Sequence, residues 1–335
     1  MPIFFIGTQN ERTTNNEKIT FADGSDYTYE AVLISKEMNA PVQVVWTRED
    51  DMAQGPFRPG AVYACKGGIN DGRINALQVK MAAQNMDHQG ANADKTNFNS
   101  STTEGFAEGY FEAIPHYSFA DISTESPVPV MWWRSVYSST NGFAFESFID
   151  ELAHAAEKDP LDFRRGHLGG ERYQAIINKL EEMTHWKNRG KNDGWGVAIT
   201  ECFKTIVGEA VKVSRNAAGK LQLDKIVAVM DYGWYVNPDI IKAQIEGSIV
   251  MALAAAVTHE THFEDGKAVE KNFDTYKMPR ISDIPPIDIY VMDNDEKPGG
   301  AGEPALPPFA PALCNAIFNL TVKLIRKLPF KMGEV

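Results

Sequence analysis

The sequence predicts an α+β fold in which mixed β-sheets pack against helices. Strand-like and helix-like segments follow one another without strict β-α-β alternation, apolar residues repeat at helical spacing in several segments, and turn residues separate paired strand-like runs. The chain has 335 residues, of which 43% are apolar and 23% are charged, and this composition excludes disordered and coiled-coil proteins. At about 100–200 residues per domain, a chain of this length predicts two lobes.

The first half of the chain is expected to form strands, one hairpin and three helices. Tyr27, Ala31, Ile34 and Met38 recur at helical spacing. Asn70-Asp71-Gly72 is a hairpin turn sequence, and Pro160 suits the first turn of a helix. The expected elements are a strand at 3–6, a helix at 26–39, a strand at 42–46, a hairpin at 61–69 and 73–83, a surface loop at 85–104, a strand at 119–123, and helices at 141–158 and from 159 onward.

The second half is expected to begin after a linker at 187–193, where the composition turns to Lys, Asn, Arg and Gly. This linker separates a first lobe, residues 1–186, from a second lobe, residues 194–335. The expected elements are paired strands at 207–214 and 221–231, a helix from 237 or 238 to 256, a hairpin at 258–264 and 269–273, a strand at 287–292 and a helix at 308–327.

Charge and cysteine content exclude several classes of function. The 33 basic and 45 acidic residues give a net charge of −12, which disfavours nucleic acid as a partner. The three cysteines are far apart and form no CxxC pair, so the sequence predicts no Cys-ligated metal site. No apolar run approaches the ~20 residues of a membrane span, and the cell compartment stays open.

The segment 298–304, Pro-Gly-Gly-Ala-Gly-Glu-Pro, is the sharpest local pattern in the sequence. Glycine allows the backbone to approach a bulky ligand, and Pro304 restricts Glu303 to an extended conformation. A carboxylate fixed beside an approachable backbone is typical of a general base. The alternative is a glycine-rich turn that carries a solvated glutamate.

Two further patterns suggest ligand contacts. Gln244, Gly247 and Ser248 stand at i, i+3 and i+4, so they share one face of the expected helix, where an amide could contact a ligand. The alternative is close helix packing with a surface glutamine. Arg134 follows two tryptophans after a proline-rich loop, which suits an anionic or heteroaromatic ligand, or else an arginine that lies over core aromatics.

Two motifs are interpreted as structural. His259 and His262 resemble a zinc-protease pair but stand one residue too close, in a segment expected to be a strand, where their rings would point to opposite faces. The acids of 48–51 lack the spacing of a calcium loop and favour a capped helix start or a solvated turn.

Taken together, these segments resemble the large subunits of the molybdenum hydroxylases, the xanthine oxidase and aldehyde oxidoreductase family, and most closely its isoquinoline 1-oxidoreductase branch. The matching stretches keep the family's order over nearly the whole chain, which makes their joint occurrence far more specific than any one of them. They are 41–52, 132–135, 146–153, 159–165, 237–247 and 302–308.

This resemblance implies roles for five residues. Glu303 matches the family's active-site base, which deprotonates a Mo–OH group before that oxygen attacks an electron-poor carbon and hydride passes to the metal site. Gln244 matches a glutamine that hydrogen-bonds the molybdopterin. Arg134 matches an arginine near the metal, and Gly247 and Gly302 fall in the same cofactor-binding segments. The pterin supplies the sulfur ligands of molybdenum, so no protein metal ligand is expected.

The resemblance also implies missing parts. Two of the family's cofactor-holding loops, Gly-Gly-Gly-Phe-Gly and Met-Gly-Gln-Gly, have no counterpart here. We therefore expect the C-terminal, molybdopterin-binding portion of a larger subunit, with an N-terminal half, a small 2Fe-2S subunit and a small-molecule substrate (an N-heterocycle or aldehyde) as partners. The cofactor is expected in its cytosine dinucleotide form in the parent and absent from this chain, which alone would be inactive. The rival hypotheses are a non-catalytic scaffold and a zinc hydrolase.

Overall fold

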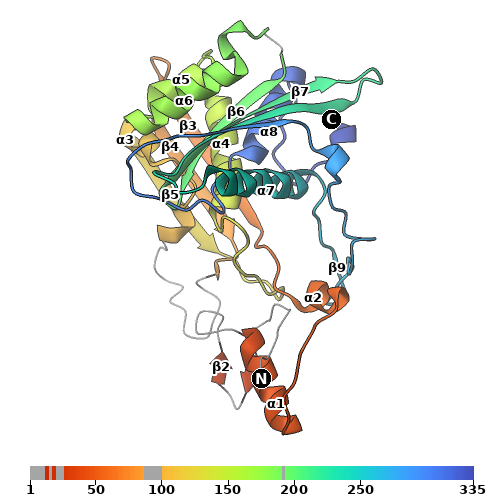
Figure 1. Cartoon of the computed structure of the whole chain (residues 1–335). Helices are drawn as coiled ribbons and strands as arrows, with labels where there is room; N and C mark the ends of the chain where they lie inside the picture. The colour runs from red at the N-terminus through yellow and green to blue at the C-terminus, as the bar shows by residue number, and fades with distance from the viewer. Residues whose placement is uncertain (1–11, 15–16, 20–25, 87–99, 191–192) are drawn as a thin grey trace.

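The computed structural model describes residues 12–14, 17–19, 26–86, 100–190 and 193–335. Two sheets form the body of the molecule, and helices cover them (Figure 1). The fold is the predicted α+β class. The expected strand at 3–6 and most of the expected loop at 85–104 lie outside the described residues.

The larger sheet has the strand order β11-β8-β7-β6. β7 pairs antiparallel with both β6 and β8, and β11 lies parallel to β8 at the edge. The strands are β6 (Trp195–Cys202), β7 (Thr205–Arg215), β8 (Leu221–Asp231) and β11 (Ile287–Val291). β6 was not predicted, because it is buried on both faces and its sequence shows no alternation of apolar and polar residues.

The smaller sheet has the order β3-β4-β5, and its β3 is an edge strand. Its strands are β3 (Ala61–Asn70), β4 (Arg73–Ala83) and β5 (His116–Ser123). The predicted hairpin at 61–83 is present, with left-handed Asp71 and Gly72 at the turn as the two-residue loop requires.

Eight α-helices are described. They are α1 (Asp26–Met38), α2 (Arg48–Gln54), α3 (Glu108–Ala113), α4 (Ser138–Ala155), α5 (Pro160–His167), α6 (Glu171–Thr184), α7 (Pro238–Val257) and α8 (Phe309–Thr321). The short strands are β1 (Arg12–Thr14), β2 (Glu17–Ile19), β9 (Phe263–Glu264) and β10 (Lys267–Ala268). Short 3₁₀ turns are η3 (Ser100–Thr103), η4 (Trp186–Asn188), η5 (Ile281–Asp283) and η6 (Met332–Glu334).

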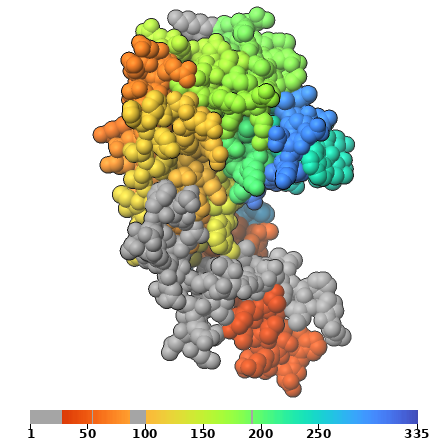
Figure 2. Space-filling model, turned by 90° about the vertical axis from the view of Figure 1, so that its left-hand side faces the viewer, coloured from red at the N-terminus to blue at the C-terminus, as the bar shows by residue number. Residues whose placement is uncertain are grey.

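Helix α1 confirms the helix expected at 26–39, and it lies at one end of the molecule. In the space-filling view its residues are found at the bottom, apart from the described residues of the two sheets (Figure 2). The smaller sheet and the helices beside it form the upper part of the same view. Helix α1 is thus set apart from the body of the molecule, which the residues after it form.

The larger sheet separates two hydrophobic cores. Helices α4 and α6 contribute to the core on one face, and α7 and α8 pack in the core on the other. The first core joins residues from both sides of the predicted linker at 187–193, for example Ile149 and Val227. The division into lobes 1–186 and 194–335 therefore stays a prediction.

Among the described helices, α7 is the one whose length and apolar composition would allow it to cross a membrane. Its residues Ile241, Ile245 and Ile249 are buried in the second core. The apolar composition of α7 is therefore explained by its packing in this core.

Several predicted elements are shorter than expected or absent. The apolar run at 42–46 forms no strand, because no neighbouring strand pairs with it in the described chain. The hairpin expected at 258–273 shrinks to β9 and β10 around the left-handed pair Asp265-Gly266. The last helix ends at Thr321 rather than at 327, because Val322 adopts a left-handed conformation with φ of 62°.

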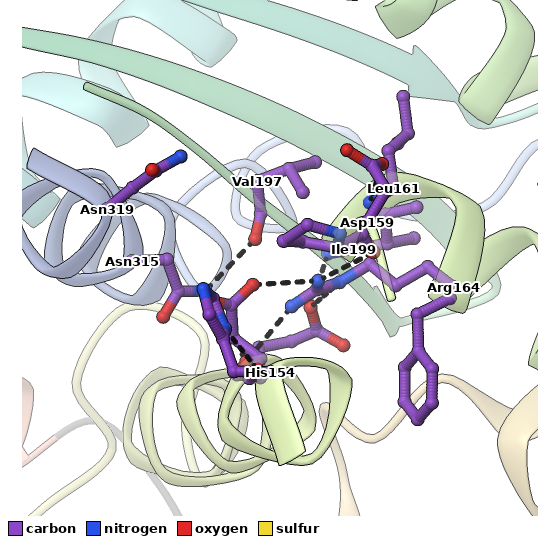
Figure 3. Close-up of polar contacts among 12 residues, drawn as sticks. His154, Asp159, Leu161, Arg164, Val197, Ile199, Asn315 and Asn319 are labelled. Carbon is purple, nitrogen blue, oxygen red and sulfur yellow. Dashed lines mark hydrogen bonds and ion pairs between the residues drawn. The ribbon is translucent and has the colours of Figure 1, made fainter. Parts of the chain in front are cut away.

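A buried ion cluster joins α4 to α5 (Figure 3). Arg164 Nε donates to Glu146 Oε2 at 2.7 Å, and its Nη1 donates to Asp150 Oδ1 at 3.1 Å. Glu146 Oε2 also accepts from the backbone N–H of Ile199 on β6 at 3.0 Å. The cluster thus fixes α4, whose first residues follow the candidate site, against the larger sheet.

Gly196 marks the closest approach of α8 to the larger sheet. A Cβ atom there would lie 2.1 Å from Ala316 N and 2.3 Å from Ala312 O, both backbone atoms. We expect Gly196→Ala to lower the free energy of unfolding by about 1–3 kcal/mol or more, because a rigid backbone contact must move. Urea denaturation would measure this loss. Gly169→Ala, with no atom within 4 Å, is the control, and equal losses in both variants would contradict the interpretation.

Candidate functional site

The segment between the proline-rich loop and α4 is strained. Ser135 and Val136 are consecutive left-handed residues, with φ of 70° and 46°. Such a conformation costs on the order of 1–3 kcal/mol per residue, and most of all for a β-branched side chain such as valine. Strain of this kind persists where the surrounding structure requires it, and it is frequent in binding and active sites.

Arg134 connects three distant segments of the chain. Its Nε donates to the carbonyl of Gly302 at 2.9 Å, and Nη2 bonds the same oxygen. Nη2 also donates to Gln244 Oε1 at 3.1 Å and to the Gln244 carbonyl at 3.2 Å. A planar guanidinium suits this task, because its donors form a rigid fork.

Glu303 is fixed by the residue that follows Arg134. The Ser135 backbone N–H donates to Glu303 Oε2 at 2.9 Å, and Ser135 Oγ donates to the Glu303 carbonyl at 2.7 Å. The left-handed backbone of Ser135 thus coincides with two hydrogen bonds to one glutamate. The second carboxylate oxygen, Oε1, makes no hydrogen bond within the described residues.

The glycine-rich loop packs against the turn between β6 and β7. That turn carries left-handed Phe203 and Lys204, and Gly300 N–H donates to the Phe203 carbonyl at 2.8 Å. A Cβ atom on Gly299 would lie 2.4 Å from Thr205 Oγ1. Gly299 and Gly300 therefore allow the loop to approach this turn closely. The sequence alone suggests a close approach to a ligand instead. Neither glycine has a positive φ.

Helix α7 presents the third segment. Asn237 caps its first turn by accepting from the N–H of Asp239 at 3.0 Å. Gln244 is exposed, and buried Ser248 on the same face donates to the Gly302 carbonyl at a long 3.4 Å. A Cβ atom on Gly247 would lie 3.6 Å from Arg134 Nη1, an ordinary van der Waals distance, so Gly247 lies beside this nitrogen.

Burial and the charge of Glu303 shift the pKa values of two neighbouring side chains, Arg134 and Cys202. Partial burial lowers the pKa of Arg134, and the charge of Glu303 raises it in turn. Burial raises the pKa of the neighbouring Cys202 thiol well above its usual range, and the charge of Glu303 adds to this shift. Cys202 is therefore a neutral thiol, and the arginine is the cation of the cluster.

The five residues predicted as a site come together in the structure. Arg134 contacts Gln244 and Gly302, Glu303 follows directly, and Gly247 lies beside Arg134. Their individual roles stay predictions.

Sequence reasoning missed the role of Ser135. A serine between Arg134 and Val136 gives no local signal of a left-handed backbone, which glycine and asparagine adopt far more readily. Only its place directly after Arg134 could have indicated that it belongs to the site.

The two motifs interpreted as structural hold no metal site in the described chain. His259 and His262 lie in irregular structure rather than in a strand, with Met278 Sδ and Glu270 as their respective partners. No group of three or more His, Cys, Asp or Glu residues there could hold a metal. The acids at 48–51 begin helix α2, which Thr47 caps.

The free donors of the cluster fit an acceptor-rich, anionic cofactor. Gln244 is exposed, its Oε1 accepts from Arg134, and its Nε2 group donates to nothing in the described chain. Arg134 Nη1 likewise makes no hydrogen bond within the described residues. Amide and guanidinium donors of this kind match the oxygen acceptors and phosphates of a pterin nucleotide.

Comparisons with known proteins identify related chains. Two family models, both described as a molybdopterin cofactor-binding domain, match residues 24–168 and 149–285. The beta subunit of isoquinoline 1-oxidoreductase from Brevundimonas diminuta is 30% identical over 90% of this chain and 40% of its own length. One of the subunits of nicotinate dehydrogenase from Pseudomonas putida is 28% identical over 92% of this chain and 28% of its own length. The chain thus spans less than half the length of these relatives.

The fold has solved counterparts. Quinoline 2-oxidoreductase from Pseudomonas putida 86 superposes with a TM-score of 0.71 at 14% identity, over 89% of this chain and 64% of that chain. At this identity the likeness concerns the fold alone.

Proposed function

Because the chain belongs to the molybdopterin cofactor-binding domain family of the molybdenum hydroxylases, we propose that it forms the C-terminal portion of an oxidoreductase subunit that oxidises an N-heterocycle or an aldehyde. Its partners are an N-terminal half, which completes the cofactor site, and a small 2Fe-2S subunit. We further propose the cytosine dinucleotide form of the cofactor.

One observation carries this proposal. Arg134 ties the backbone of Gly302 to the side chain of Gln244, and the next residue, Ser135, holds Glu303 by two hydrogen bonds. Three segments separated by up to 168 residues thus present two free donors and one carboxylate at one place. A purely structural role does not require the two N–H groups that lack partners in the described chain, Gln244 Nε2 and Arg134 Nη1.

In the proposed reaction, a C–H bond of the substrate becomes a C–O bond with oxygen from water, and two protons and two electrons are released. When bound, the molybdenum cofactor supplies the two-electron oxidising centre. Glu303 accepts one proton at its free Oε1, because Ser135 N–H holds Oε2 in place and so orients the carboxylate. The proposed 2Fe-2S subunit would accept the electrons.

Gln244 and Arg134 are proposed to bind the cofactor rather than to take part in proton transfer. The unpartnered Nε2 group of Gln244 would donate to the pterin, and Arg134 Nη1 would donate to an anionic oxygen of the cofactor. Gly247 lies beside Arg134 Nη1, where a Cβ atom would be in ordinary van der Waals contact at 3.6 Å. Gln244 and Arg134 are therefore expected to affect cofactor content more than turnover.

Replacing Gln244 by alanine in the complete protein tests the binding role. We expect molybdenum content per subunit to fall several-fold, while activity per bound molybdenum falls much less, because the variant loses a donor to the cofactor and keeps Glu303. Metal analysis and activity assays on the same sample measure both. Lys242→Ala, an exposed residue two positions earlier on α7, is the control. Full molybdenum content in Gln244→Ala would contradict the binding role.

The same measurement separates the rival functions. Near-stoichiometric molybdenum in the complete protein supports the oxidoreductase, and its absence from a folded complete protein supports a non-catalytic scaffold. We propose that this 335-residue chain by itself retains no cofactor and has no activity, because two of the family's cofactor-holding loops are missing from it.

A further inference from the structure

A cavity lies apart from the candidate site. It has a volume of about 770 Å³ and is bounded by the edge strand β3, by one face of α4 and by the segment 325–328. Arg134, Gln244 and Glu303 do not line it. Sites for small organic ligands are typically about 300–1,000 Å³ in volume.

The cavity contains a shielded arginine without an acidic partner. Arg58 Nε is inaccessible to solvent and has no hydrogen-bond partner in the described chain. Its Nη2 donates to Ser139 Oγ at 3.1 Å, and its guanidinium lies 4.2 Å from the centre of the Trp133 ring. Arg58 forms no ion pair with any carboxylate of the described residues. A shielded charge of this kind is costly unless an anion pairs with it.

The groups around Arg58 supply no negative charge either. Tyr63 and Tyr276 are neutral phenols with raised pKa values, chiefly because they are buried. Burial, together with the charge of Arg58, lowers the pKa of His259 to about 4, so this imidazole is neutral at pH 7. The guanidinium therefore remains uncompensated within the described residues.

The rest of the cavity wall is mainly apolar, with a few hydroxyl groups and the charged side chains of Glu151, Arg326 and Lys327. Phe143, Phe148 and Leu328 line it together with Ser147, whose Oγ is shielded and has no partner in the described chain. The acidic residue of the wall, Glu151, is paired with Arg326, with 2.5 Å between Oε2 and Nη2. The cavity thus combines a shielded unpaired guanidinium, the exposed ammonium of Lys327, which forms no ion pair within the described residues, and aromatic walls.

We propose that this cavity binds an organic carboxylate with an apolar, flat body. The carboxylate would accept from the two terminal nitrogens of Arg58, Nη1 and Nη2, which the planar guanidinium holds as a fork. The apolar body would lie against the Phe143 and Phe148 side chains, which line the cavity. A volume of about 770 Å³ greatly exceeds what an inorganic anion fills, so the walls favour an organic ligand.

Binding of benzoate to the purified 335-residue chain tests the proposal. Titration calorimetry should show saturable binding, with neutral benzamide at least about tenfold weaker, because benzamide lacks the charge that pairs with Arg58. Benzoate at saturation should also raise the melting temperature by about 2 °C or more. Inorganic phosphate should bind more weakly than benzoate, since it leaves the aromatic walls uncovered.

Arg58→Met keeps an unbranched, mainly aliphatic side chain, although a shorter one, and removes the guanidinium with its charge. We expect at least a tenfold loss of benzoate affinity, while Arg215→Met, an exposed arginine on β7, leaves it unchanged. Should Arg58→Met fail to fold, Arg58→Lys retains the charge without the fork and should lose affinity partially. The proposal is overturned if the folded wild-type chain shows no saturable benzoate binding, if phosphate binds as tightly, or if folded Arg58→Met binds benzoate as the wild type does.

Discussion

Replacing Glu303 by glutamine in the complete protein is expected to reduce turnover by about 10²–10⁴-fold, or by more. The variant keeps nearly the same shape and can still accept the Ser135 N–H, but it cannot take up a proton at Oε1. General-base catalysis contributes on this scale, equivalent to about 3–5 kcal/mol of activation free energy. Steady-state assays normalised to bound molybdenum would measure the loss, with molybdenum content itself unchanged.

Glu246→Gln is the matched control for this experiment. Glu246 is an exposed glutamate on α7, and the exchange removes the same charge close to the cluster without touching Glu303. It should leave turnover within about threefold of the parent, less than half a decade of rate. The same small effect in Glu303→Gln would show that Glu303 is not the base.

Arg164→Met is expected to cause the largest loss of stability among single changes in the ion cluster, about 3–5 kcal/mol. Arg164 is fully buried between Glu146 and Asp150, whose side chains are 1% and 4% exposed. The variant leaves two buried carboxylates without their cation. Urea denaturation would measure it, and Arg165→Met on the partly exposed neighbouring arginine should cost at most about 1 kcal/mol.

The pH dependence of this variant follows from the same carboxylates. Burial raises the pKa values of Glu146 and Asp150 above 4.5 and 3.8, and Arg164 opposes the shift. Without Arg164 these folded-state pKa values rise further. A raised carboxyl pKa stabilises the folded state at low pH, and this contribution is lost as pH rises through the folded-state value. The variant should therefore be closer to wild type at about pH 5 than at about pH 8, and a difference independent of pH would contradict this account.

Elements that depend on a few adjacent residues could be predicted from the sequence. The turn at Asp71-Gly72, the cap of α7 at Asn237 and the start of α5 at Pro160 are of this kind. Strand β6 could not be predicted in this way, because burial on both faces removes its periodicity. The strand predicted at 42–46 is absent although its sequence is apolar, since an apolar segment becomes a strand only beside a pairing strand.

In the candidate site, too, local features could be predicted from the sequence and long-range contacts could not. The residues Arg134, Gln244 and Glu303 could be proposed because each stands in a recognisable local pattern. The contact of Gly299 with Thr205 and the hold of Ser135 on Glu303 depend on segments that are far apart in the chain. No local pattern encodes such contacts, so only the tertiary structure reveals them.

The hydrogen bonds of Arg134 have a kinetic consequence. They join residues 110 and 168 positions apart, so this cluster closes two long loops of the chain. Contacts of such separation form late in folding, after local helices and hairpins. A chain arrested before that step exposes Gln244 and Glu303 on unconnected segments and offers no joint binding surface. Under the proposed function, the cofactor would therefore bind only to chains that have completed folding, and incompletely folded chains would stay without it.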